Sequence, residues 1–117
     1  MTLNREDIIG KKNAIEVKAV TVPVWGEVFV RKLSAKGIEQ VEAIRFEARF
    51  PANNYHGRIS TLLLCDKDGN LVFQESDADE LGNRPDVAEA LIVAVKQGLI
   101  FNKLSDPAAE NEATKKN

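Results

Sequence analysis

The sequence contains very little cysteine and histidine, and this scarcity excludes several kinds of site. Cys65 is the only cysteine and His56 the only histidine among 117 residues. One cysteine forms no internal disulfide and no four-cysteine zinc site, and one histidine excludes a histidine-rich metal site. The length is that of one domain. We therefore expect a single hydrophobic core, without covalent or metal cross-links, in a reducing compartment.

Long apolar runs and an excess of one charge are absent as well. No stretch approaches the ~18 apolar residues that span a bilayer, and the first residues lack the pattern of a secretory signal. Sixteen basic and eighteen acidic side chains are mixed along the chain, which leaves no basic field for a phosphate backbone. We expect a soluble protein that binds neither membrane nor nucleic acid.

The first half of the chain shows strand patterns and then a helix pattern. Residues 14–22 alternate with a period of two, which predicts a strand. Turn-forming residues follow at 23–26, and residues 27–33 resume a strand composition, so the two runs predict a hairpin. Ser34 suits a helix N-cap, and the apolar residues after it recur at a spacing near 3.6. A helix is predicted from Ser34 until Pro51 ends it.

A second hairpin is predicted in the middle of the chain. Residues 51–57 are polar and turn-forming and predict a loop. The apolar run 58–65, the turn residues 66–69 and the β-rich residues 71–73 then favour strand, turn and strand. Residues 76–82 predict a short capped helical turn that glycine stops.

The last helix is the most apolar segment. Pro85 and Asp86 suit a first helical turn, and residues 87–101 supply the body. Apolar side chains cover more than one stripe, so this helix must be buried nearly all round. One sheet face does not cover such a helix, and we expect another subunit to cover part of it. The predicted fold class is α+β: a small antiparallel sheet of two hairpins packed against two main helices.

Both ends of the chain are polar. Residues 1–13 predict a weakly ordered arm with one helical turn at 4–7. Residues 105–117 contain no large apolar side chain and predict a disordered polar tail. The single domain is therefore expected to span residues 1–104.

Few side chains are candidates for chemistry. His56 stands in the predicted loop, where a solvated side chain is the simpler interpretation and an acid–base role needs a partner brought close by folding. Cys65 ends an apolar run, so a small buried residue is the simpler interpretation and a nucleophile needs a base or a helix terminus beside it. No phosphate loop, nucleophile elbow or zinc-protease motif is present. We expect no enzyme and no cofactor.

Two acidic segments have both a metal-binding and a purely structural interpretation. Asp66, Asp68 and Asn70 have the spacing that starts a calcium loop, but Leu71 and Asp77 replace the glycine and glutamate such a loop needs. A tight turn is the better interpretation. A cluster that could bind a cation or a basic partner, or simply begin a helix, comprises Glu75, Asp77, Asp79 and Glu80.

A few apolar side chains are candidates for contact with another protein. Trp25 either covers the core beside the first hairpin or anchors a partner. Phe46 and Phe50 lie four residues apart, where helical side chains touch, and off the main apolar stripe. Together with the last helix, they give the predicted interface residues Trp25, Phe46, Phe50, Ile92, Val95 and Leu99.

The order of these features resembles the tail assembly chaperones of long-tailed, non-contractile bacteriophages, of lambda-like siphophages or prophages. The resemblance spans roughly residues 3 to 103. In order, it comprises the Arg-Glu-Asp start, the strand pair around Val22 to Gly26, the helix opened by Ser34, the Asp-x-Asp-Gly turn at Asp66 to Gly69, and Leu81-Gly82 before a final helix that ends near Asn102.

This resemblance implies a non-enzymatic assembly factor of α+β fold. Such a factor binds the tape measure protein, helps to recruit tail tube subunits, self-associates, and works in the host cell cytoplasm without entering the mature virion. The family also makes a longer product by ribosomal frameshifting. Lys116 and Asn117 can be encoded by an adenine-rich slippery run, so we expect the slip there.

Two other functions are compatible with the sequence. One is a structural tail or head completion protein that stays in the virion. The other is a small cytoplasmic enzyme or ligand-binding domain that uses His56, Asp66 and Asp68.

Overall fold

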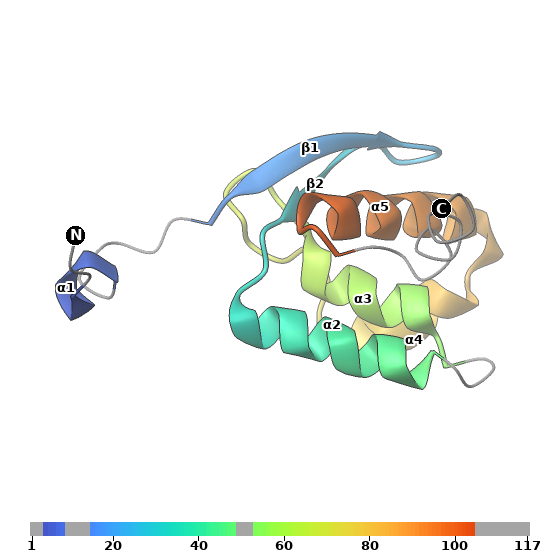
Figure 1. The fold of residues 1–117 in the computed structure, drawn as a ribbon. Coiled ribbons are helices and arrows are strands. Elements are labelled where there is room, and N and C mark those ends of the chain that lie inside the picture. The colour runs from blue at the N-terminus through green and yellow to red at the C-terminus, as the bar shows by residue number, and fades with distance from the viewer. Residues whose placement is uncertain (1–3, 9–14, 49–52, 105–117) are drawn as a thin grey trace, which may run out of the picture.

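The computed structural model describes residues 4–8, 15–48 and 53–104. A three-stranded antiparallel sheet lies on one side of the last helix, α5 (Ala88–Phe101), and helix α3 (Tyr55–Leu63) lies on the other (Figure 1). Helices α2 (Ala35–Glu47) and α4 (Ala78–Asn83) pack against α3. The predicted α+β class is confirmed. The predicted tail at 105–117 lies outside the described residues, and of the N-terminal arm the structure describes one helical turn, α1 (Arg5–Ile8), where a turn was predicted.

The first hairpin is confirmed. Strands β1 (Val17–Val22) and β2 (Gly26–Arg31) pair antiparallel. In the tight turn between them the Trp25 N–H donates to the Pro23 carbonyl at 2.7 Å. Gly26 takes a φ of 75°, and Val24 a φ of 69°, which is rare for a β-branched residue. Alternate side chains of the two strands, including Val20 and Val30, pack against α5.

The prediction for residues 55–63 was wrong. Instead of a loop and a strand, α3 (Tyr55–Leu63) occupies this segment, and only Leu64–Cys65 forms a strand, β3, which pairs with β2. The apolar run is too short for its periodicity to separate helix from strand. Ile59 and Leu63, four residues apart and both fully buried, show that helical spacing prevails.

The second hairpin is therefore much shorter than expected. The turn after β3 is present, with the Gly69 N–H donating to the Asp66 carbonyl at 3.0 Å. Its returning arm makes only the isolated bridge between Cys65 and Leu71. Within residues 15–48 and 53–104 the sheet consequently has three strands, and three main helices are present rather than two.

Helix α2 (Ala35–Glu47) begins where the sequence predicts. The Ser34 hydroxyl accepts a hydrogen bond from the Gly37 N–H at 3.0 Å. The helix ends at Glu47, before Pro51, which lies outside the described residues. Val41 and Ile44 of the predicted stripe are buried.

Removal of this cap gives a first prediction. Ser34→Ala leaves the Gly37 N–H without its side-chain acceptor, and we expect a loss of about 1 kcal/mol in the free energy of unfolding. Urea denaturation followed by circular dichroism measures it. Ser34→Asn, which keeps an acceptor at the N-cap, is the matched control, and equal loss in both variants would contradict the capping role.

The short helical segment predicted at 76–82 is present, but Gly82 does not stop it, because the helix continues to Asn83. A 3-10 turn (Glu75–Asp77) leads into α4 (Ala78–Asn83). A second 3-10 turn (Pro85–Val87), with proline in its first turn, leads into α5 (Ala88–Phe101).

Helix α5 divides the core into two parts. The sheet side of the helix packs Ala90 and Ala94 against the strands, and the opposite side packs Val95 and Leu99 against α3 and α2. The described chain thus covers most of α5 itself. We expected another subunit to do so because the sequence did not predict α3.

The end of α5 is joined to the segment after β2 by one buried amide. Asn102 accepts from the Leu33 N–H at 2.7 Å through Oδ1. Its Nδ2 donates to the carbonyls of Arg31 at 3.0 Å and Gly98 at 2.9 Å. This side chain therefore fixes the sheet side of the molecule to the helical side.

Candidate interaction site

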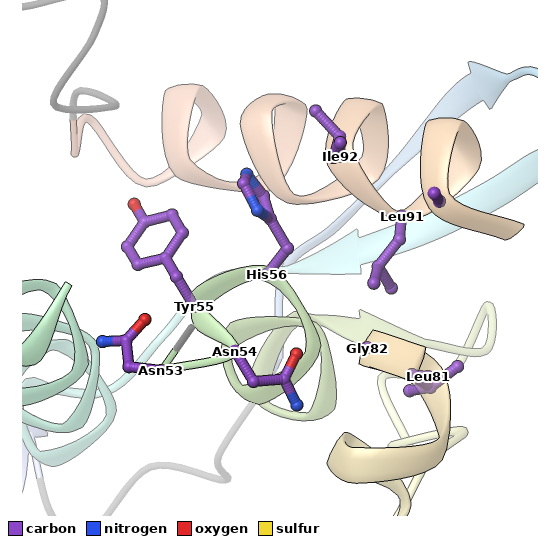
Figure 2. A pocket seen from close by; sticks show the side chains of 9 residues that line it. Asn53, Asn54, Tyr55, His56, Leu81, Gly82, Leu91 and Ile92 are labelled. Atoms are coloured by element: carbon purple, nitrogen blue, oxygen red, sulfur yellow. The ribbon is translucent and has the colours of Figure 1, made fainter. Parts of the chain in front are cut away.

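A pocket of about 330 Å³ opens where the N-terminal part of α3 meets α4 and the first turns of α5 (Figure 2). Apolar side chains of α4 and α5 form one wall, and polar side chains from the start of α3 form the other. The lining residues are Asn53, Asn54, Tyr55, His56, Leu81, Gly82, Ala88, Leu91 and Ile92.

Asn54 fixes the shape of this pocket. Its backbone takes the left-handed conformation, with φ 59°, directly before α3 begins. Its Nδ2 donates to the Ala78 carbonyl at 2.7 Å and so ties α3 to α4. The amide occupies the space above two glycines, since a Cβ on Gly57 or on Gly82 would clash with Asn54 Oδ1. Both glycines are needed for this close packing.

Two aromatic side chains, Tyr55 and His56, are the ionisable groups of the pocket. His56 packs edge-on to Tyr55, with ring centroids 5.0 Å apart, and both side chains rise from α3 toward α5 (Figure 2). His56 is the one ionisable side chain of the pocket besides the Tyr55 phenol, because the other lining residues are amides, aliphatic residues and glycine. Because one wall is apolar and the other polar, the pocket fits a ligand side chain that is apolar along its length and polar at its end.

Three predicted interface residues lie at the surface or close to it. Phe46 is 61% exposed, and Ile92, at the rim of the pocket, is 46% exposed. Trp25 is half-buried, with its ring 6.4 Å from that of Phe73. For Trp25 the structure therefore favours the core-covering interpretation. Phe50 lies outside the described residues.

Two predicted interface residues must be corrected. Val95 is 1% exposed and Leu99 is 0% exposed, and both pack against α3 and α2. They cannot contact another protein while the domain is folded. The cause is again α3, which covers the face of α5 that the sequence left without a partner.

The exposed face of α5 contains an apolar residue that the prediction missed. Ile100 is 52% exposed and lies two turns after Ile92, with exposed Lys96 midway between them. Lys96 is the one charged side chain in the middle of this helix. A lone charged residue in an apolar helix indicates the face that is exposed to solvent. The position of Lys96 in the sequence would therefore have predicted that Ile92 and Ile100, four residues to either side, are exposed.

The candidate chemical residues are separated in the structure. His56 lies in α3 and lines the pocket, not in a loop as predicted, whereas Asp66 and Asp68 lie in the turn after β3 and do not line it. Asp66 Oδ1 accepts from the N–H groups of Asp68 at 2.8 Å and Asn70 at 3.0 Å, and these hydrogen bonds lower the pKa of the Asp66 carboxyl. This carboxylate thus holds the turn, as the structural interpretation predicts.

The remaining candidates also have structural roles. Cys65 is buried in β3, and burial raises the pKa of its thiol. In the acidic cluster, Asp77 Oδ2 accepts from the Gln74 N–H at 2.8 Å, which caps the turn before α4. In the part of the chain that the structure describes, histidine, cysteine and carboxylate side chains nowhere gather in threes as metal ligands. Of the described helices, none has the length and apolar character required to cross a bilayer.

Fold and site together define a small α+β domain with an open pocket and exposed apolar side chains on α5. No family model and no curated protein matches the sequence. Among solved structures, the chain is similar to the one described as "Structure of bacteriophage HK97 tail assembly chaperone", with a TM-score of 0.48 and 20% sequence identity over 73% of this chain and 83% of that chain.

Proposed function

We propose that this chain is a phage tail assembly chaperone without enzymatic activity, which binds the tape measure protein and helps to recruit tail tube subunits. The observation that carries the proposal is the row of exposed apolar side chains on α5, Ile92 and Ile100, beside an open pocket. An amphipathic helix of the client packs its apolar face against these two isoleucine side chains. The order of sequence features over residues 3 to 103 supports the same function.

The proposal extends to where the protein acts and how it assembles. It works in the cytoplasm of the infected cell, is left out of the mature virion, and self-associates so that many copies coat a long client. A longer form arises by frameshifting at Lys116 and Asn117. Reading the gene tests that last point, because codons for these two residues without a slippery heptamer would exclude the slip.

Co-expression with the tape measure protein encoded downstream tests the central proposal. We expect a soluble complex that survives pull-down and size-exclusion chromatography, from a client that is insoluble alone. Absence of any complex, together with recovery of this chain from purified virions by mass spectrometry, would overturn the proposal in favour of a structural tail or head completion protein.

One substitution tests the surface itself. Ile92→Asp places a charge on the row and at the rim of the pocket, and we expect about tenfold weaker binding of the client, as for the loss of an interface anchor. The unfolding midpoint should remain close to that of the wild type because the side chain is 46% exposed. Lys67→Gln, at an exposed residue in the turn after β3 and outside the pocket lining, is the control and should bind normally. Equal binding by all three proteins would place the client elsewhere.

A further inference from the structure

Among the residues that the structure describes, no strand pairs with the outer edge of β1. The strand order is β1-β2-β3, so β1 is an outer strand, and Figure 1 shows it along the border of the sheet. Its six residues, Val17–Val22, include neither proline nor glycine and only one charged side chain, Lys18. An edge of this kind is a template for pairing with another strand.

The pairing with β2 determines which backbone groups point to that open edge. The Lys32 N–H donates to the Glu16 carbonyl at 2.8 Å, which makes these two residues a hydrogen-bonded pair. Hydrogen-bonded pairs alternate along an antiparallel ladder, so the even-numbered residues of β1 bond to β2. The N–H and C=O groups of Val17, Ala19 and Thr21 therefore point outward, and they have no hydrogen-bond partner among the described residues.

We propose that this edge pairs with β1 of a second copy of the chain, antiparallel, across a twofold axis at Ala19. The inference deepens the proposed function, since it names the surface through which the protein self-associates. In this register Ala19 faces Ala19 of the second copy, and Val17 faces its Thr21. Three hydrogen-bonded pairs that exchange two bonds each satisfy all six outward groups on each strand.

Charge and backbone chemistry select this register over its two neighbours. Here Lys18 faces Val20 of the second copy. A shift by two residues in one direction places Lys18 directly opposite Lys18, and like charges in that position are destabilising. A shift in the other direction brings Val17 opposite Pro23, which has no N–H to donate.

The outer face of the sheet also favours a second copy as the partner. The register aligns Ala19, Phe29, Cys65 and Leu71 in one apolar row across the sheet. Ala19 is exposed at the end of this row, and its methyl group presents no steric barrier to an identical residue. Pairing through β1 would join two such rows into one row across a six-stranded sheet.

Disulfide cross-linking tests both the interface and its register. In a Cys65→Ala background, Ala19→Cys places two thiols on the axis, where Cα atoms of a hydrogen-bonded pair are about 5.5 Å apart and can be bridged. We expect most of this variant to become a covalent dimer under mild oxidation. Thr21→Cys alone should remain monomeric on a denaturing gel, because its copies are about 13 Å apart along the strands.

A mixture of two single-cysteine variants tests whether the proposed register brings their positions together. Thr21→Cys mixed with Val17→Cys should form a mixed dimer, since the proposed register pairs these two positions. Failure of Ala19→Cys to cross-link, or efficient cross-linking of Thr21→Cys with itself, would overturn the proposal.

A proline at the same position separates this inference from the proposed function. Ala19→Pro removes only an outward N–H, which an edge strand tolerates, and should halve the molar mass measured by light scattering. Ala19→Ser keeps the N–H and should remain associated. An unchanged mass in folded Ala19→Pro, or a wild type that is monomeric throughout, would overturn the interface. In the co-expression assay, a dimeric wild type that fails to bind the client would overturn the proposed function while leaving the interface intact.

Discussion

Leu99→Asp is expected to unfold the domain. The Leu99 side chain is 0% exposed and packs in the cluster formed by α2, α3 and α5. Truncation of such a leucine to alanine costs about 2–5 kcal/mol, and burial of an unpaired carboxylate adds to this loss. The total approaches the whole stability of a typical domain, about 5–15 kcal/mol. Circular dichroism and urea denaturation would therefore show loss of the cooperative transition.

The matched control for this prediction lies one residue further along the same helix. Ile100→Asp introduces the same charge at a side chain that is 52% exposed, and should change the free energy of unfolding by about 1 kcal/mol or less. If Leu99→Asp instead folded normally and only its state of association changed, Leu99 would be an interface residue, as the sequence alone suggested.

Asn102→Ala is expected to cost about 2–4 kcal/mol. The substitution removes three hydrogen bonds and leaves the Leu33 N–H and the Arg31 carbonyl without their partner between the sheet and the helices. A part-buried polar group that loses its partner costs about 1–3 kcal/mol. The urea midpoint should fall with little change in the slope of the transition.

An exposed asparagine provides the comparison. Asn83→Ala, at the end of α4, should remain within about 0.5 kcal/mol of the wild type. If the two alanine variants were equally stable, the Asn102 amide would not join the sheet to the helices.

The first hairpin, α2 and α5 were predictable from the sequence because strong local signals agree with the tertiary structure. Period-two alternation runs through 17–22, Ser34 is the N-cap of α2, and Pro85 opens the 3-10 turn that leads into α5. Helix α3 was not predictable in this way. Its apolar run is short, and the polar residues before it resemble a loop. Asn54, in the left-handed conformation directly before the helix, instead ties α3 to α4 through its side chain.

The errors at the candidate site follow from that missing helix. Without α3, the side of α5 that carries Val95 and Leu99 has nothing to pack against, and an interface is the natural explanation for its apolar character. With α3 in place, the exposed face is the one marked by Lys96. Ile92, a predicted interface residue, lies on this face and is 46% exposed, and its contact with another protein stays a prediction.

The single cysteine allows local opening of the sheet to be measured by thiol labelling, without any substitution. Cys65 is 4% exposed between β2 and the bridge to Leu71, and burial raises the pKa of its thiol. A thiol reagent therefore reacts only when this part of the sheet separates. The labelling rate of the unmodified chain measures how often the sheet opens, and a client or a second copy that stabilises the sheet will be detected as slower labelling.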